Sequence, residues 1–169
     1  MIPSTHRQVR LAARPAGYPR ESDFRLVTSP VPEPGEREFL VRVIYLSLDP
    51  YMRGRMSDAR SYVPAVVLGD VMEGGVVGEV LRSNHPGFSV GDVVEGRFGW
   101  QEYALSAGKG VRKIDPTIAP ISTALGVLGM PGLTAYFGLL EVGQPKSGET
   151  VSCRRRRERS AASWARSRS

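Results

Sequence analysis

The residues best suited to chemistry on a carbonyl group lie in one short stretch, Leu48-Asp-Pro-Tyr-Met-Arg-Gly-Arg55. Tyr51 offers a phenol that can donate a hydrogen bond to a carbonyl or enolate oxygen, and Arg53 is a fixed cation. Pro50 stiffens the backbone and moves Asp49 away from helical geometry. Judged by spacing alone, a turn at the end of a strand with exposed polar residues is the simpler interpretation.

A second candidate pair, Met130 and Thr134, lies in a predicted helix. Pro131 suits the first turn of that helix, and apolar residues recur at helical spacing, namely Leu133, Phe137 and Leu140. Residues four positions apart share a helix face, so Met130 and Thr134 could contact one ligand together. A core methionine and a threonine bonded to its own backbone explain the pair equally well.

The sequence predicts no metal site. A catalytic zinc needs about three N, S or O ligands from the protein and an open position. The chain has one cysteine, Cys153, and two histidines, His6 and His85, which lie near predicted turns or termini and lack a ligand four residues away. The single cysteine also excludes an internal disulfide framework.

The positive charge of the chain is confined to its last residues. Residues 153–169 hold seven arginines and one glutamate, so the net charge of +6 leaves residues 1–152 with 16 basic and 16 acidic side chains. A specific nucleic-acid interface is therefore not expected on the folded part. No apolar run reaches the ~18 residues of a membrane span, and no secretory signal begins the chain. We expect a cytoplasmic protein that does not bind membranes.

The elements that must position these residues read as a series of short strands between Gly- and Pro-rich turns. This pattern predicts a mainly β fold, either a barrel or a sandwich, with strands at residues 6–13, 24–28, 38–46, 69–81, 91–96 and 100–105. The strand at 38–46 is apolar on both faces, which predicts a central strand. The glycines of 69–81 indicate bends or bulges, and residues 51–61 read as a surface loop.

The second half of the chain is predicted to be helical. Ser122 and Thr123 could cap a short helix near residue 125. The helix of Met130 and Thr134 should end at Gly143 and Pro145. Residues 148–152 then begin like a buried strand.

Two stretches carry a resemblance to a known family. The run Gly129-Met-Pro-Gly-Leu-Thr-Ala-Tyr-Phe-Gly138 and the stretch 48–55 resemble the zinc-independent medium-chain dehydrogenase/reductases, in the branch of NADPH-dependent alkenal, prostaglandin and curcumin reductases. The similarity covers about residues 6–152. It implies a GroES-like, partly open β-barrel at residues 1–125. It also implies a linking helix and the first strand of a truncated Rossmann domain at 126–152, followed by a basic tail at 153–169.

The same resemblance assigns roles to the candidate residues. It places Tyr51 and Arg53 at the substrate, with Tyr51 as the catalytic hydrogen-bond donor, and it places Pro50, Met130 and Thr134 at the nicotinamide of NADPH. The implied activity is reduction of the C=C bond of small α,β-unsaturated aldehydes and ketones. A quinone reductase of the same superfamily is the nearest alternative enzyme.

The remaining alternatives concern the end of the chain. Residues 153–169 contain no glycine, so they lack the Gly-rich turn that binds a dinucleotide's pyrophosphate. This predicts that the chain as written is inactive. The tail reads as a disordered end, as a frameshifted copy of the family's next segment, or as a polyanion-binding module on a non-catalytic barrel. The oligomeric state is not predicted.

Overall fold

A computed structural model of the chain describes residues 1–59 and 63–152. The tail predicted at 153–169 lies outside these residues. The chain divides into two compact units, Met1–Asp115 and Pro116–Ser169. The domain boundary predicted near residue 125 stays a prediction, because compactness alone does not show where an independently folding domain ends. No helix in the described residues is long and apolar enough to cross a membrane.

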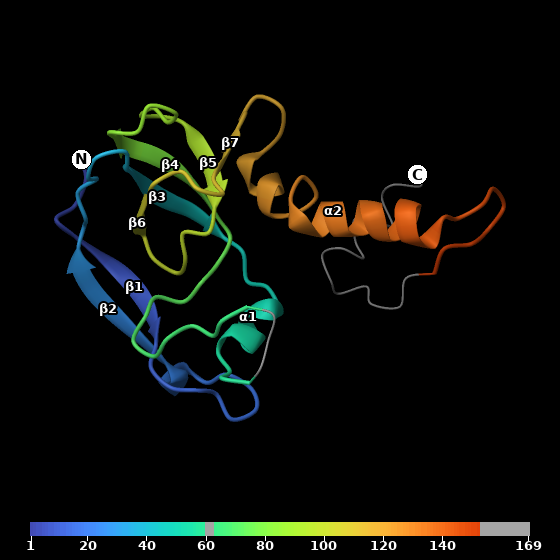
Figure 1. Ribbon diagram of the computed structural model, residues 1–169, viewed down its shortest axis with the longest axis horizontal. Coiled ribbons are helices and arrows are strands. Elements are labelled where there is room, and N and C mark those ends of the chain that lie inside the picture. Colours follow the sequence, from blue (N-terminus) through green and yellow to red (C-terminus); the bar gives the residue numbers. More distant parts are fainter. Residues whose placement is uncertain (60–62, 153–169) are drawn as a thin grey trace. The chain divides into compact units, whose positions relative to one another are not determined.

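The first unit contains two antiparallel sheets (Figure 1). In the smaller sheet β1 (Thr5–Leu11) pairs with β2 (Phe24–Pro30), and the 3-10 turn η1 (Glu21–Asp23) precedes β2. The larger sheet has the order β6-β3-β4-β5-β7. Its strands are β3 (Phe39–Leu46), β4 (Val76–Ser83), β5 (Val93–Gly96), β6 (Tyr103–Ser106) and β7 (Arg112–Ile114). Two isolated bridges, Gln8 with Gln101 and Arg10 with Val71, tie β1 to the rest of the unit.

The mainly β fold predicted from the short strands is confirmed, as is the central position of the strand at 38–46, which lies between β6 and β4. The predicted strand at 69–81 is wrong in its first half. Only residues from Val76 onward pair as β4, while Gly69 lies in a turn and Val71 forms the isolated bridge. Strand β7 was not predicted, because the three residues Arg-Lys-Ile carry no apolar alternation.

A bulge in β3 changes the side-chain pattern that alternation predicts. Strict alternation places Val43 and Leu46 on opposite faces, yet both pack against the same hydrophobic cluster. The register with β4 shifts between Val43 and Tyr45, which inserts Ile44 as an extra residue. On β4, a Cβ on Gly78 would lie 2.4 Å from Val41 Cγ1 and 2.5 Å from the Arg42 carbonyl oxygen, so this close approach requires glycine.

The interior of the first unit is split into two hydrophobic clusters. The sheet cluster lies in the five-stranded sheet and consists of Phe39, Val41, Val76, Val80, Val94, Phe98 and Ala104. The second cluster is named the α1 cluster after the short helix α1 (Tyr51–Arg55), which lies in the segment after β3. It joins the smaller sheet to that segment and consists of Leu11, Met52, Met56, Val66 and Met72, with Phe24, Tyr51 and Trp100 packed against it.

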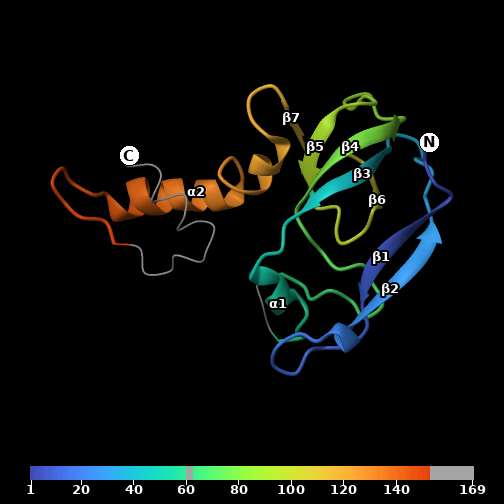
Figure 2. The same ribbon diagram turned by 180° about the vertical axis from the view of Figure 1, so that it is seen from behind.

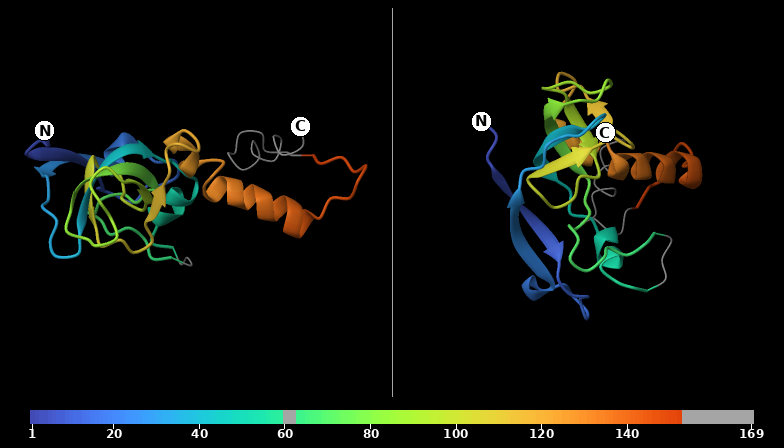
Figure 3. Two further views of the ribbon diagram at one scale, coloured as in Figure 1. Left: turned by 90° about the horizontal axis from the view of Figure 1, so that it is seen from above. Right: turned by 60° about the vertical axis from the view of Figure 1, so that its left-hand side comes forward.

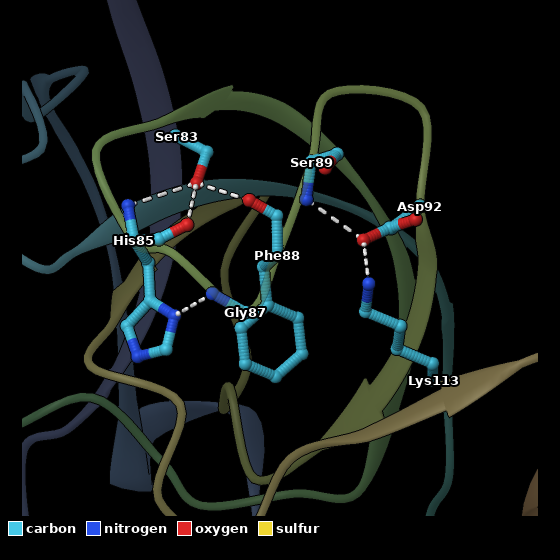
Figure 4. Close-up of polar contacts among 7 residues, drawn as sticks. All are labelled: Ser83, His85, Gly87, Phe88, Ser89, Asp92 and Lys113. Carbon is cyan, nitrogen blue, oxygen red and sulfur yellow. Dashed lines mark hydrogen bonds and ion pairs between the residues drawn. The ribbon is translucent and has the colours of Figure 1, made fainter.

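A network of hydrogen bonds fixes the loop between β4 and β5 (Figure 4). The Gly87 amide donates to His85 Nδ1 at 3.0 Å, and the His85 amide donates to Ser83 Oγ at 3.1 Å. Asp92 Oδ2 accepts from Lys113 Nζ at 2.6 Å, and Lys113 lies 5.5 Å from the centroid of the Phe88 ring. His85 is therefore a structural residue of this loop.

The described part of the second unit, residues 116–152, is mainly helical. It contains the 3-10 turn η2 (Ile121–Leu125), the α-helix α2 (Met130–Phe137) and the π-helical segment η3 (Gly138–Gly143), which continues α2 without a break (Figure 3). The helix predicted around Pro131 is confirmed, including its end at Gly143. A Cβ on Gly132 would lie 1.8 Å from the Val127 carbonyl oxygen, so the turn before α2 can approach the helix only because residue 132 is glycine.

Two predictions in this unit are wrong. The short helix at η2 begins one residue before the predicted cap, and the Thr123 hydroxyl donates to the Pro120 carbonyl at 2.7 Å instead of capping the helix. Residues 148–152 form no strand, because a buried strand needs a neighbouring strand to accept its hydrogen bonds, and none is present in the described part of this unit.

Candidate functional site

The candidate site is built on α1 (Tyr51–Arg55), which follows β3 after the connecting residues 47–50 (Figure 2). The prediction of a surface loop at 51–61 is wrong for its first five residues. Pro50 has helical angles (φ −56°, ψ −32°) at the start of this turn, where a proline needs no amide hydrogen. Met52 and Met56 lie four residues apart and are both buried, so they anchor the helix to the α1 cluster.

Tyr51 is the first residue of α1 and is half-buried against this cluster. Burial raises the pKa of its phenol above the ordinary value, and the carboxylate of Asp49 raises it further, while the Arg97 guanidinium opposes them. The phenol therefore keeps its proton at neutral pH and can act as a hydrogen-bond donor. No group among the described residues accepts a hydrogen bond from it.

Arg53 holds the loop that joins β1 to η1. Its Nε donates to the Gly17 carbonyl and its Nη2 to the Pro15 carbonyl, each at 3.0 Å. Arg14, from that loop, donates in the opposite direction through Nη1 to the Met56 carbonyl at 3.2 Å and to the Val66 carbonyl at 2.7 Å. Two arginines thus tie the loop and α1 together, and much of the donor capacity of Arg53 is used on backbone carbonyls.

Arg55 forms a two-pronged ion pair with Glu73. Arg55 Nε donates to Glu73 Oε2 at 2.7 Å, and Arg55 Nη2 contacts Glu73 Oε1. The Arg55 side chain is only 11% exposed, and its Nη1 is buried without an acceptor, as is Trp100 Nε1 in the same unit. A buried donor without an acceptor costs free energy. The ion pair with Glu73 therefore holds α1 in place against the cost of two unsatisfied donors, Arg55 Nη1 and Trp100 Nε1.

An open hollow of about 330 Å³ lies beside α1. Its wall is formed by Pro19, Leu48, Asp49, Pro50, Met52, Arg53, Met56 and Trp100. Six of these eight side chains are apolar, so the hollow offers a surface for a nonpolar group. Its volume lies near the lower end of the ~300–1,000 Å³ range of small-molecule pockets.

Of the five predicted site residues, the structure brings Pro50, Tyr51 and Arg53 together at α1. Met130 and Thr134 lie together on α2, in the second unit. Met130 is exposed, and the Thr134 hydroxyl donates to the Met130 carbonyl at 2.8 Å, which is the backbone bond that the simpler interpretation predicts. The roles of all five residues stay predictions.

The residues predicted at the cofactor offer neutral contacts only. Pro50 presents an exposed ring, Met130 a thioether, and Thr134 an oxygen that can still accept a hydrogen bond from an amide. These groups fit a nicotinamide and its carboxamide, whereas none of the three carries a charge for a phosphate. Within residues 1–59 and 63–152, no three His, Cys, Asp or Glu side chains gather in a way that could hold a metal ion.

Sequence reasoning missed the three lining residues outside the stretch 48–55, namely Pro19, Met56 and Trp100. In the sequence, Trp100 was interpreted only as the start of a strand, and Pro19 only as part of a turn-rich connection. The methionine pair at positions 52 and 56 has helical spacing and could have indicated both α1 and its buried face. No sequence signal connects Trp100 to α1, because their contact depends on the tertiary fold.

Comparison with known proteins defines the class to which this fold and site belong. The family described as the N-terminal domain of oxidoreductase matches residues 7–114. The chain belongs to this family, within the medium-chain dehydrogenase/reductase superfamily. Its relatives there are NADP-dependent alkenal, prostaglandin and curcumin reductases, which confirms the resemblance read from the two sequence stretches and the GroES-like barrel it implies.

Individual relatives are similar over most of this chain. It is 51% identical over 149 residues to the putative NADP-dependent oxidoreductase YfmJ of Bacillus subtilis, covering 88% of this chain and 43% of that protein. It is 55% identical over 141 residues to the NADPH-dependent curcumin reductase of Escherichia coli, covering 83% and 41%. The crystal structure of CurA in complex with NADPH from Vibrio vulnificus superimposes with a TM-score of 0.79 at 51% identity, over 85% of this chain and 42% of that one.

The chain therefore spans about 40% of the length of the relatives it matches. Solved quinone reductases also match, but at 17–20% identity they show the fold alone.

Proposed function

We propose that this chain provides the substrate-binding barrel of an NADPH-dependent reductase that saturates a C=C bond conjugated to an aldehyde or ketone. The observation that supports this proposal most directly is the environment of the Tyr51 phenol. The phenol is half-buried at the start of α1 beside an apolar hollow, keeps its proton, and has no hydrogen-bond acceptor among the described residues. The similarity to curcumin and alkenal reductases supports the same substrate class. No observation favours the quinone or polyanion-binding alternatives.

Tyr51 is proposed as the group that stabilises the carbonyl oxygen of the substrate. Bound NADPH supplies the hydride that reaches the β-carbon. As the enolate forms, negative charge builds on the oxygen, and a phenol donor placed there stabilises that charge more than it stabilises the neutral carbonyl. The raised pKa suits this role, because the phenol remains a donor across the neutral range.

Pro50, Met130 and Thr134 are proposed to contact the nicotinamide. Pro50 precedes the catalytic candidate directly, so a ring packed on Pro50 would lie next to the carbonyl that Tyr51 binds. Met130 and Thr134 share a face of α2 and offer a polarizable thioether and a hydroxyl to the ring and its amide.

The test is a fusion protein in which residues 1–152 replace the matching segment of the Escherichia coli curcumin reductase. The fusion should oxidise NADPH in the presence of trans-2-octenal, and Tyr51→Phe should lower kcat by about 10²-fold while the Kd for NADPH stays unchanged. Tyr18→Phe is the matched control, because Tyr18 is 93% exposed and does not border the hollow. An unchanged kcat in Tyr51→Phe removes Tyr51 from the site. A fusion that binds NADPH without reducing the enal refutes the proposed reaction.

A further inference from the structure

We propose that one side of the continuous helix formed by α2 and η3 is a self-association surface, on which a second copy of this chain docks antiparallel to the first (Figure 3). This side is called the α2 surface. It consists of large apolar residues that are exposed, namely Met130, Leu133, Tyr136, Phe137, Leu140 and Val142. Contiguous exposed apolar residues of this kind mark surfaces that bind another macromolecule.

The spacing along the helix places these residues side by side. From Met130 to Leu140, each is three or four positions from another member of the surface, so they share one side of the helix. On the opposite side, Ala135 and Leu139 are buried. The helix is thus apolar all round, and a helix of this kind is normally covered all round in water.

The charges of this segment favour a second copy as the cover. In a pair with two-fold symmetry the same surface meets itself, so it must be complementary to itself. Glu141 is the only charged side chain between residues 126 and 143, so two apolar surfaces can meet without like charges in contact. A lipid surface fits less well, because helices that lie on membranes carry Lys and Arg on their polar side.

The position of Glu141 sets the direction of the pair. No side chain caps the start of α2, which is the positive end of the helix dipole. In an antiparallel pair, Glu141 of each copy lies at the start of α2 of the other copy. In a parallel pair, the two Glu141 carboxylates would lie side by side and repel each other.

The basic residues 153–169 favour the same direction, because they carry a net charge of +6 in each chain. The helix spans 8 residues of α2 and 6 of η3, which makes it about 20 Å long. In an antiparallel pair the chains leave the helices at opposite ends, separated by more than the ~8–10 Å over which charges interact at ordinary salt concentrations.

The size of the α2 surface predicts a weak dimer. Aromatic side chains bury ~150–250 Å² when they are covered completely, so six large side chains that are about half exposed or more offer roughly 500–700 Å² on each copy. Both copies together would bury about 1,000–1,400 Å², the size of a weak but specific interface. Docking would also cover Met130, so the dimer and the proposed contact of Met130 with the nicotinamide exclude each other.

The experiment is sedimentation equilibrium of the whole chain under reducing conditions, from about 1 to 200 µM at about 0.15 M salt. We expect a monomer–dimer equilibrium with a Kd of about 1–100 µM. Phe137→Glu should weaken association at least about tenfold, because it buries a charge without a partner. Leu26→Glu is the matched control, at a 64% exposed leucine of β2, and should leave the Kd unchanged.

A mixing experiment separates loss of the surface from loss of folding. If Glu141 lies at the start of the other copy's helix, residue 137 of one copy lies opposite residues 133 and 134 of the other. Leu133→Lys alone should weaken association as Phe137→Glu does. A mixture of the two variants should dimerise at least about tenfold more tightly than either alone, because the new charges then pair. An unfolded variant could not be rescued in this way.

A chain that stays monomeric at about 200 µM overturns the proposal, since something other than a second copy then covers the α2 surface. Equal weakening by Phe137→Glu and Leu26→Glu also overturns it, as do masses that grow beyond the dimer. Without recovery in the mixture, or with tighter association in Glu141→Gln, the antiparallel direction is wrong. None of these measurements uses NADPH or an enal, so their failure leaves the proposed function untouched.

Discussion

Replacing Glu73 by glutamine should lower the free energy of unfolding by about 2–3 kcal/mol, although the change removes only one charge. Its partner Arg55 is 11% exposed and already has one buried nitrogen without an acceptor. Removing one member of a buried ion pair costs about 3–5 kcal/mol, because the other charge is left without compensation. Glu73 itself is 33% exposed, so water reaches that end of the pair and we lower the expected cost accordingly.

The control is an ion pair of similar chemistry on the surface. Arg42 and Glu79 lie opposite each other on β3 and β4, with side chains 50% and 32% exposed, and their Nη2 and Oε2 are 2.6 Å apart. Exposed pairs contribute about 0–1 kcal/mol, so Glu79→Gln should cost no more than that. Urea denaturation followed by circular dichroism gives both values, provided that the slopes against urea agree.

A double variant tests the physical reason. Arg55→Met combined with Glu73→Gln leaves no buried charge, so it should be more stable than Glu73→Gln alone, even though it carries one more substitution. The reasoning is refuted if Glu73→Gln costs no more than Glu79→Gln, or if the second substitution adds a further loss of stability.

Two further predictions concern stability. Burial lowers the pKa of His6 below its ordinary value, against the opposing charge of Glu102, so the unfolded chain takes up the proton first and stability should fall as the pH drops below about 6.5. Urea midpoints at about pH 7.5 and 5.5 should differ in the wild type more than in His6→Gln, and an equal difference would contradict the assignment. Gly132→Ala should reduce the helical circular dichroism signal, because its Cβ would meet the Val127 carbonyl oxygen at 1.8 Å. Gly54→Ala, in open space on α1, should instead stabilise the chain by about 0.4–1 kcal/mol, and a loss of signal there as well would show that the clash is not the cause.

The sequence predicted those parts of the fold whose signal is local. The central strand could be predicted because its residues are apolar on both faces. The helix at Pro131 could be predicted because its proline, its apolar spacing and its terminal glycine all indicate the same helix. The bulge at Ile44 could not be predicted, since it depends on how β3 packs against Gly78 of the neighbouring strand β4. The prediction of a strand at 148–152 was wrong because it also depends on a tertiary contact. A strand forms only where another strand pairs with it.

The candidate site divides in the same way. Tyr51 and its neighbours stand next to one another in the sequence, so their chemistry could be read directly. The preference of Arg53 for the Pro15 and Gly17 carbonyls could not, because it joins residues 36 and 38 positions apart. A fixed cation reads equally well as a substrate contact or as a structural tie, and only its hydrogen bonds distinguish these roles.

The division of the interior into two clusters has a consequence for how the first unit comes apart. A helix of five residues has no stability of its own, so α1 persists only while its methionines stay packed in the α1 cluster. The five-stranded sheet is held by the separate sheet cluster and does not need that packing. Amide hydrogens of α1 should therefore exchange with solvent through an opening that costs less than global unfolding. On warming, the segment that carries Tyr51 should become accessible to proteases while the strands are still paired.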